Sequence, residues 1–295
     1  MATTQEYALL SLYVYKVARE AINRPNLPQG WTFLEAKDDN LLGFSYGVFK
    51  RSGTNEIVLA YTGTNENVDW ASNVTAGIGL PSWQVANAAL VYQQVKQTYG
   101  SNITLSGHSL GGGLASVMAT WFNRPAVVFD EAPFQLTAAN PTMLGLVRAQ
   151  LLAAGYSDAA MDNAISDFSS REAQVANHYL QGEILNALRV DANTVAGSDT
   201  RIDINGDQAG AVQLHSVALL AAASMSNSFR LATYASTSVI PLIMDDKLYG
   251  FNTGTSTQKN FLVDLIRSEQ SAVVAKASSA TSPSTSTNWA PTSPA

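Results

Sequence analysis

The segment ITLSGHSLGGG, residues 103–113, decides how this chain folds. Its first half is a β-branched and apolar run typical of a buried strand, and an alanine-rich helical pattern follows its glycines. Between them stands Gly-His-Ser-Leu-Gly, the G-x-S-x-G pattern that places a serine on a sharp turn from a strand into a helix. Such a turn has no room for bulky neighbours, and Gly107 and Gly111 stand two residues from Ser109 on either side. We therefore predict that Ser109 is a nucleophile.

The overall composition is that of a globular protein with one large domain or two small ones. The chain has 295 residues, of which 46% are hydrophobic and 14% charged, so a sizeable core and a sparsely charged surface are expected. A net charge of -6 argues against nucleic acid as a partner. Because the chain has no cysteine, disulfides, thiolate metal sites and cysteine nucleophiles are excluded.

The beginning of the sequence, MATTQE, has neither the basic start nor the apolar core of a secretory signal peptide. The most apolar windows, such as residues 217–225, are too short to cross a bilayer. We therefore expect a soluble protein without an N-terminal signal peptide. Export, if it occurs, would follow an unconventional route, and the lack of cysteine leaves the compartment open.

Strand and helix patterns alternate around the serine segment, and this alternation predicts a mostly parallel central sheet with crossover helices on its faces. Residues 135–173 have a long helical pattern and are expected to form an insertion after the strand that follows the serine turn. The other helices are expected at residues 6–21, 85–99, 216–225 and within 226–270. The other strands are expected at residues 31–34, 43–49, 56–61, 126–133 and 174–180, with a hairpin at 190–204 that turns at Gly197 and Ser198.

The domain organisation follows from a change in composition near residue 271. Residues 1–270 carry core-forming patterns throughout, so we expect a single domain there. From Ser271 onward the chain is rich in Ser, Thr, Ala and Pro. Such a composition is typical of a flexible tail or linker, which we expect at residues 271–295.

A second motif follows the buried strand that ends at Tyr61. The residues Thr62, Gly63 and Thr64 combine a glycine with hydroxyl side chains at the end of a strand. This arrangement suits an oxyanion site, where a loop presents a backbone N–H to a developing negative charge and a hydroxyl adds a second hydrogen bond.

Three motifs together resemble the class 3 lipase family, which contains fungal-type triacylglycerol lipases and related bacterial lipases and phospholipases. They are Thr62-Gly63-Thr64 followed by Asp69-Trp70 and Asn73, the elbow Gly107-His108-Ser109-Leu110-Gly111-Gly112, and His215-Ser216 at the start of a helix. The resemblance covers residues 56–222. It implies an α/β-hydrolase fold, ester hydrolysis and no cofactor. The segment 135–173 is not part of the minimal family core.

The resemblance also implies the two oxyanion donors. The backbone N–H of Thr64, helped by its hydroxyl, would be one donor, with Thr62 as the neighbouring alternative. The N–H of Leu110, directly after the nucleophile, would be the other. Asp69 and Trp70 are interpreted as structural residues that hold this loop.

The general base can be sought among only three histidines. His108 lies within the elbow and is expected to point away from the serine as a buried, hydrogen-bonded residue. His178 lies in an apolar strand pattern and is expected to be structural. His215 follows all of the strands and begins a helix, which matches the order Ser…acid…His of these folds, so we predict that it is the base.

The acid that orients the base is expected after the second strand beyond the elbow. Glu183 follows that strand directly, and its surroundings are similar to the family's aspartate followed by an apolar residue and a leucine. The family usually has aspartate here, whereas this chain has glutamate, which can serve the same role. We favour Glu183, and the alternatives left open are Asp130, Asp191, Asp203 and Asp207.

Residues 203–207 read DINGD and alternate oxygen-bearing side chains as a calcium loop does. Asp203, Asn205 and Asp207 would be the ligands, and Asp199 adds a fourth. The later glutamate of an EF-hand is missing, so a turn with solvated acids is the favoured interpretation and calcium the alternative.

These residues predict a serine carboxylic-ester hydrolase that cleaves lipid acyl esters through an acyl-enzyme, as a triacylglycerol lipase or phospholipase does. A short-chain esterase or an acyltransferase on the same triad is the alternative. A non-catalytic binding scaffold is less well supported, because Ser109 and His215 are both present. The expected partner is a lipid or ester substrate, with transient contact to a membrane or lipid interface. Residues 77–83 and 143–147 are candidates for a lid.

Overall fold

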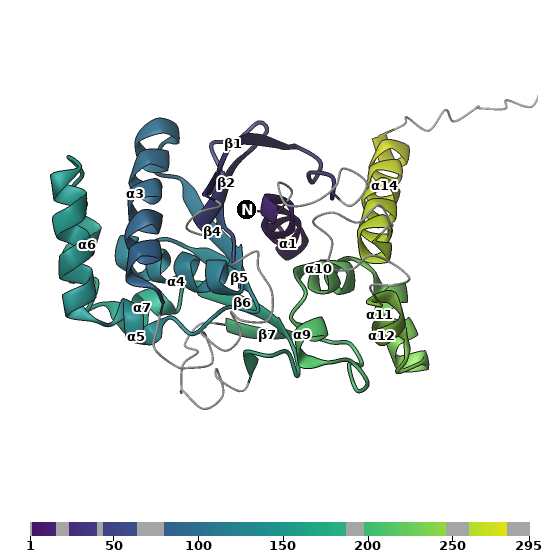
Figure 1. Cartoon of the computed structure of the whole chain (residues 1–295). Helices are drawn as coiled ribbons and strands as arrows, with labels where there is room; N and C mark the ends of the chain where they lie inside the picture. Colours follow the sequence, from purple (N-terminus) through teal and green to yellow (C-terminus); the bar gives the residue numbers. More distant parts are fainter. Residues whose placement is uncertain are drawn as a thin grey trace, which may run out of the picture.

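The computed structural model describes residues 2–15, 24–39, 44–63, 80–186, 198–245 and 260–281. Within these ranges the chain forms a seven-stranded sheet with helices on both faces (Figure 1). The strands are β1 (Trp31–Asp39), β2 (Phe44–Arg51), β3 (Ile57–Tyr61), β4 (Ile103–His108), β5 (Ala126–Phe129), β6 (Val175–Leu180) and β7 (Ser198–Ile202).

The strands lie in the sheet in the same order as in the sequence. The pairs β1–β2 and β2–β3 are antiparallel, as the turn between β2 and β3 predicts, whereas β3 to β7 are parallel to one another. Parallel neighbours need a crossover connection, and the described helices supply it between β3 and β4, between β4 and β5, and between β5 and β6. The predicted α/β-hydrolase fold with a mostly parallel sheet is confirmed.

The predicted hairpin at residues 190–204 is wrong in its described half. Ser198 does not form a turn but begins β7, which pairs parallel to β6 with Ala176 opposite Ser198. The edge of β6 offers unpaired N–H and C=O groups, and β7 satisfies them along its full length. Residues 187–197 lie outside the described ranges.

The helices form one layer on each face of the sheet. In Figure 1, α3 and α6 lie on one side, and α1, α10 and α14 lie on the other. The helical segments are α1 (Thr4–Tyr13), α3 (Ser82–Tyr99), α4 (Leu110–Phe122), α5 (Gln135–Ala138), α6 (Pro141–Ala153), η3 (Ala159–Asn163), α7 (Phe168–Glu172), α9 (Ala211–Leu214), α10 (Val217–Met225), α11 (Asn227–Ala235), α12 (Val239–Ile243) and α14 (Phe261–Thr281).

Two apolar cores result from this arrangement. On the first face, α3 and α4 cover the sheet, and the rings of Tyr92 and Phe122 stack with their centroids 4.1 Å apart. On the second face, α1 and α10 pack together and bury side chains such as Leu10 and Leu220, while α14 adds Leu262. Burying both faces is the requirement that a parallel sheet imposes, and it explains the near-continuous apolar runs of β3 and β4.

The predicted insertion at residues 135–173 is helical but consists of four short segments, α5, α6, η3 and α7. The breaks have local causes. Asn140 caps α6 by accepting hydrogen bonds from the N–H groups of Thr142 and Met143, and Pro141 follows at the first helical position. Gly155, at a φ of 84°, lies beyond the end of α6, and the Asp158 side chain caps η3.

The predicted flexible tail begins too early. Helix α14 continues from Phe261 through Ser271 to Thr281, so the first residues assigned to the tail are helical. This stretch reads SAVVAKASSAT and contains good helix formers, and the first helix-breaking proline comes only at Pro283. Residues 282–295 lie outside the described ranges. In the part of the chain that the structure describes, none of the helices combines the length and apolarity needed to cross a membrane.

The insertion is tied to the sheet layer through the buried side chain of Arg171. Its guanidinium donates to the carbonyl oxygens of Thr120 and Trp121, in the last turn of α4, and to that of Ala160 in η3. The last carbonyls of a helix have no partner within the helix, so Arg171 satisfies groups that would otherwise be buried and unbonded. Asp167 completes the set with an ion pair at 3.1 Å.

We expect Arg171→Ala to lower the free energy of unfolding by about 3 kcal/mol, because several buried acceptors lose their donor together. Arg148→Ala is the matched control, since Arg148 pairs with Asp162 on the surface of the same insertion. Its cost should stay below about 1 kcal/mol. Denaturant unfolding measures both values, and equal losses in the two variants would contradict this role of Arg171.

Candidate active site

Ser109 stands at the sharp turn that joins β4 to α4. Its φ of 60° and ψ of -129° lie in a region that L-residues other than glycine rarely adopt. Backbone hydrogen bonds hold it there: its N–H donates to the Phe129 carbonyl at 3.0 Å, and its carbonyl accepts from Gly113 and Ala132. The hydroxyl makes no capping bond to the described N–H groups of α4. The predicted elbow geometry is therefore present, and the hydroxyl is not used to cap the helix.

The glycines around Ser109 are required by space. A Cβ on Gly107 would lie 2.4 Å from the Gly111 carbonyl oxygen, and a Cβ on Gly111 would lie 2.3 Å from the Tyr61 carbonyl oxygen. Side chains at Gly112 and Gly113 would meet the chain that follows β5. These contacts explain the glycine pattern of the elbow, because helix and strands approach more closely than any Cβ would allow.

His215 and Glu183 meet in the structure, 32 positions apart in the sequence. His215 follows α9, Glu183 follows β6, and His215 Nδ1 lies 2.5 Å from Glu183 Oε2. The same carboxylate oxygen accepts from the Leu185 N–H at 2.8 Å, and Gly182 makes the preceding turn at a φ of 84°. Both side chains are almost fully buried. This is the orientation that an acid must give to a catalytic histidine.

His108 places this pair beside the elbow. It immediately precedes Ser109, its ring centroid is 4.7 Å from that of His215, and its Nε2 lies 2.9 Å from the His215 carbonyl oxygen. His108 is thus a buried, hydrogen-bonded residue, as predicted, but its partner is the backbone of the predicted base. Ser109, His215 and Glu183 therefore converge on one end of the parallel sheet.

The alternative acids are placed less favourably. Asp130 is buried after β5, where one oxygen accepts from the Leu180 N–H at 3.0 Å and the other lies 3.8 Å from His108 Nε2. Asp203 accepts from the Tyr234 hydroxyl and lies 3.5 Å from Arg201. Asp207 is exposed, and Asp191 lies outside the described ranges. Glu183, by contrast, lies within hydrogen-bond distance of a His215 ring nitrogen, at 2.5 Å.

The oxyanion loop is described only as far as Gly63. The Thr62 hydroxyl donates to the Ser45 carbonyl, so this alternative donor is used within the sheet. A Cβ on Gly63 would lie 3.2 Å from the Ser109 Cβ, which places the loop directly over the elbow. Thr64 lies outside the described residues, as do Asp69, Trp70 and Asn73. Leu110 is the first residue of α4, a position whose N–H has no intrahelical partner and is suited to an anion.

Tyr15 is a site residue that the sequence patterns did not single out. Its hydroxyl accepts a hydrogen bond from the Gly63 N–H at 2.7 Å and lies 3.4 Å from His108 Nδ1. It follows α1, in what reads in the sequence as the continuation of an ordinary helix. No local pattern marks a tyrosine whose partners are 48 and 93 positions away.

The predicted calcium alternative has little support from the side chains. Asp203 contacts Arg201 and Tyr234, and Asn205 Oδ1 accepts from the Asp207 N–H, so these oxygens already have donors. The Asp199 carboxylate accepts from Asn177. Among the residues that the structure describes, the one grouping with metal-ligating geometry is His108, Asp130 and His215, which belongs to the site already described.

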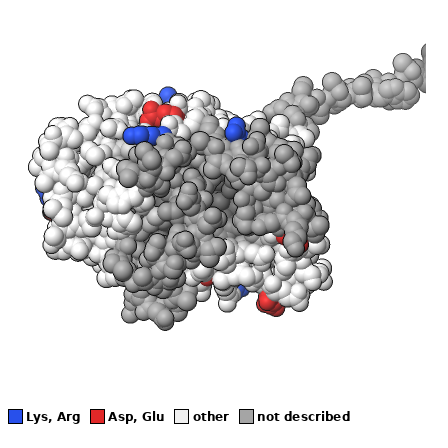
Figure 2. Space-filling view, in the orientation of Figure 1, with Lys and Arg blue, Asp and Glu red and all other residues white. Residues whose placement is uncertain are grey.

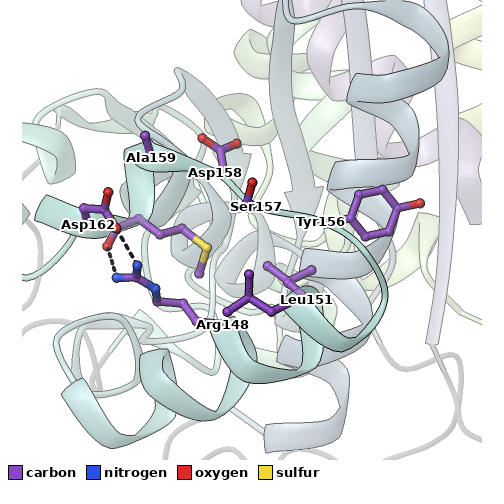
Figure 3. Close-up of a pocket in the computed structure, with 9 residues that line it drawn as sticks. Arg148, Leu151, Tyr156, Ser157, Asp158, Ala159 and Asp162 are labelled. Carbon is purple, nitrogen blue, oxygen red and sulfur yellow. Dashed lines mark hydrogen bonds and ion pairs between the residues drawn. The ribbon is translucent and has the colours of Figure 1, made fainter.

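A separate hollow lies in the insertion. A cavity of about 250 Å³ is lined by residues of α6 and the following segment, including Arg148, Tyr156 and Asp158 (Figure 3). None of its lining residues belongs to the elbow or to the histidine–glutamate pair.

In the same insertion, the lid candidate at residues 143–147 lies on α6, which buries Leu144 and Val147 in the core that it shares with α3. This packing favours a structural role for α6.

Charge is sparse on the face of the molecule shown in Figure 2. Where that face is made of described residues, most of it is uncharged, and Lys and Arg side chains occur in one small group beside acidic ones and at scattered positions. The described part of this face therefore carries no broad basic surface, in keeping with the 14% of charged residues in the sequence.

A mostly parallel sheet with a strained serine at the end of a central strand, and a histidine–carboxylate pair beside it, defines an α/β-hydrolase. A family model described as a Tle-like phospholipase domain matches residues 6–237. The chain belongs to this phospholipase family, which confirms the predicted resemblance to lipases.

One curated relative and several solved structures are similar to the chain. It is 38% identical over 90 residues to an extracellular phospholipase A1 of Serratia liquefaciens, a match that spans 30% of this chain and 28% of the relative. The Rhizomucor miehei lipase–propeptide complex aligns with a TM-score of 0.42 at 15% identity, over 69% of this chain and 68% of that one. The nonglycosylated LIP2 lipase of Yarrowia lipolytica aligns with a TM-score of 0.43 at 14% identity, over 68% and 80%.

We expect Glu183→Gln to lower kcat by about a hundredfold or more, because a neutral amide neither fixes the His215 tautomer nor stabilises the imidazolium. Asp130→Asn is the matched control: Asp130 is equally buried, but one of its oxygens lies 3.8 Å from His108 Nε2. It should lower kcat much less. Steady-state hydrolysis of p-nitrophenyl esters distinguishes the two, and a larger loss in Asp130→Asn would assign the acid to Asp130 instead.

His178 lies in β6 away from the paired residues, stacked on Phe129 with ring centroids 5.7 Å apart. Burial lowers the pKa of His178 below its ordinary value of 6.5. Residue 178 therefore binds a proton more tightly in the unfolded chain than in the folded one. As the pH falls below the pKa that His178 has in the unfolded chain, protonation favours the unfolded chain and the free energy of unfolding decreases. Between about pH 7.5 and 5.5, the free energy of unfolding should fall less in His178→Gln than in the parent chain. Free energies of unfolding that fall equally with pH in the variant and in the parent chain would contradict this prediction.

Proposed function

We propose that the protein is a serine carboxylic-ester hydrolase that removes acyl chains from phospholipids. The observation that carries the proposal is the 2.5 Å contact between His215 Nδ1 and Glu183 Oε2, beside a strained serine whose hydroxyl does not cap its helix. Membership in a phospholipase family supports the substrate class.

In the proposed first step, the Ser109 hydroxyl oxygen attacks the carbonyl carbon of the ester. His215 Nε2 takes the hydroxyl proton, and Glu183 stabilises the imidazolium that forms. The negative charge on the former carbonyl oxygen is met by the Leu110 N–H and by the proposed donor Thr64. The tetrahedral intermediate collapses, His215 returns the proton to the leaving alcohol, and the acyl group remains on Ser109.

In the second step, water replaces the alcohol. His215 accepts a proton from the water as its oxygen attacks the acyl carbon, and the same donors stabilise the second tetrahedral intermediate. The proton then passes to the Ser109 oxygen, the acyl bond breaks, and a fatty acid leaves. Burial of His215 and Glu183 supports this cycle, because the low local dielectric strengthens the interaction between the two charges.

The phospholipid assignment rests on the family and on the name of the Serratia relative, whose aligned stretch is 28% of its own length. By analogy with that name, we propose that the sn-1 ester is cleaved. Triacylglycerol hydrolysis is the second candidate, favoured by the predicted resemblance to fungal-type lipases. Transient contact with a membrane or lipid interface follows from either substrate. We also infer that the domain extends through α14, because Leu262 and Ile266 are buried in the second core.

We expect Ser109→Ala to abolish release of fatty acid from phosphatidylcholine vesicles, because no nucleophile remains. The folded fraction, measured by thermal unfolding, should be unchanged or higher, since the strained backbone persists without the hydroxyl. The parent chain should react with a fluorophosphonate probe and the variant should not. Ser116→Ala is a suitable labelling control, because Ser116 is buried and donates to Glu131.

The substrate is tested by offering phosphatidylcholine, a triacylglycerol and p-nitrophenyl butyrate side by side. We expect the sn-1 chain of the phospholipid to be released faster than acyl groups are released from the other two substrates. Preference for the butyrate would identify a short-chain esterase. Retained hydrolysis in Ser109→Ala would overturn the serine mechanism.

A further inference from the structure

Three residues that take no part in the proposed proton transfers form a chain of hydrogen bonds around the elbow. The Gly63 N–H donates to the Tyr15 hydroxyl at 2.7 Å, and that hydroxyl lies 3.4 Å from His108 Nδ1. On the other side of its ring, His108 Nε2 lies 2.9 Å from the His215 carbonyl oxygen. The chain thus begins at the residue before the proposed oxyanion donor Thr64 and ends at the proposed base.

The chemistry of the groups decides which of them donates and which accepts in each hydrogen bond. A carbonyl oxygen can only accept, so His108 Nε2 must carry a proton and donate to His215. In neutral His108 the other nitrogen, Nδ1, is then an acceptor, which suits donation from the Tyr15 hydroxyl. That hydroxyl has a lone pair for the Gly63 N–H. Every donor is used once, and the contacts run in one direction from Gly63 to His215.

The packing around this chain is close. A Cβ on Gly63 would lie 2.9 Å from the Tyr15 hydroxyl oxygen, 3.2 Å from the His108 carbonyl oxygen and 3.2 Å from the Ser109 Cβ. The ring of Tyr15 meets that of His108 edge-on, with centroids 6.2 Å apart, and the ring of His108 is tilted against that of His215 at 4.7 Å. A shift of any one of these groups therefore displaces its neighbours.

We propose that Tyr15 and His108 are positioning residues that hold the oxyanion loop and the base at a fixed separation across Ser109. Glu183 fixes the side chain of His215, and His108 fixes its backbone. Tyr15 fixes the direction of the Gly63 N–H, at the last described residue before the proposed oxyanion donor. This inference rests on the proposed serine mechanism, because positioning matters only if the two sides act on the same reacting carbon.

The magnitude of the effect follows from the need for pre-organisation. Oxyanion donors and a general base act only when they lie within a few tenths of an ångström of their productive positions. Loss of one positioning hydrogen bond is expected to lower kcat by about tenfold, with little change in KM, because the residues lie beside the reacting atoms rather than along the acyl chain.

A purely structural role for Tyr15 makes a different prediction, and a matched control separates the two. Tyr7→Phe removes a hydroxyl from α1, the helix that Tyr15 follows, where the hydroxyl bonds to Glu56 at 3.1 Å, away from the elbow. If Tyr15 only stabilises the fold, Tyr15→Phe and Tyr7→Phe should both lower the Tm and leave kcat unchanged well below that temperature.

The experiment compares Tyr15→Phe, Tyr7→Phe and Ser109→Ala in the full chain. The readouts are kcat and KM on p-nitrophenyl esters and the second-order rate of labelling by a fluorophosphonate. We expect Tyr15→Phe to lose about tenfold in kcat and in the labelling rate, with KM within about twofold, while Tyr7→Phe keeps both. If Ser109→Ala is inactive and Tyr15→Phe behaves like Tyr7→Phe, the positioning role is overturned and the serine mechanism stands. If Ser109→Ala stays active, the proposed function itself has failed.

A double-mutant cycle tests whether Tyr15 and His108 act together. His108→Phe keeps a ring of similar size and removes both hydrogen bonds, and it is combined with Tyr15→Phe. Coupled residues should give a double variant whose loss of kcat falls short of the product of the two single losses. A loss of kcat in the double variant equal to the product of the two single losses would show that Tyr15 and His108 act independently. That result would contradict the proposal that they act together. Should His108→Phe not fold, the labelling rate of Tyr15→Phe still decides the proposal.

Discussion

The strained backbone of Ser109 is the constraint around which the structure is built. A serine at a φ of 60° costs free energy of order 1–3 kcal/mol, and such a conformation persists only where the surroundings determine it fully. Here three parallel strands do so. Strand β4 delivers the serine, the end of β5 accepts its N–H, and the end of β3 lies so close to Gly111 that no side chain fits. The apolar layers on both faces keep these strands in register.

The parallel arrangement of these strands also explains why the polar groups of the site gather at one end of the sheet. The carboxyl ends of parallel strands meet at a common edge, and the chain after each of β3, β4, β5 and β6 contributes to the cluster there. Polar groups buried so densely must satisfy one another, because an unbonded one costs about 1–3 kcal/mol. The contacts of Glu183 with both His215 and Leu185, and of His108 with the His215 carbonyl, meet this demand.

Much of this arrangement was predictable from the sequence because the signals are local. The elbow needs small residues at defined spacings, and three histidines leave few choices for a base. Glu183 was reachable because it directly follows a recognisable strand. The parallel pairing of β7 was not, since a glycine–serine pair reads equally well as a turn or as the start of a strand. The length of α14 was misjudged because alanine is common in both flexible tails and helices. Tyr15 was missed for a deeper reason: its role depends on contacts with Gly63 and His108 that only the folded chain creates.

We propose Glu183 as the acid where the resemblance to class 3 lipases implies an aspartate, and the turn that carries Glu183 offers a physical explanation for this difference. A glutamate side chain is one methylene longer, so the backbone must stand further from His215 for the carboxylate to arrive at 2.5 Å. Gly182, at a φ of 84°, forms the turn that follows β6, and the carboxylate accepts a hydrogen bond from the Leu185 N–H in the segment after that turn. The longer side chain therefore gains no freedom, because its charged end is held by its own backbone as well as by the histidine. Acid and turn form one unit, and an aspartate placed here would lose the reach to His215 unless the turn moved with it.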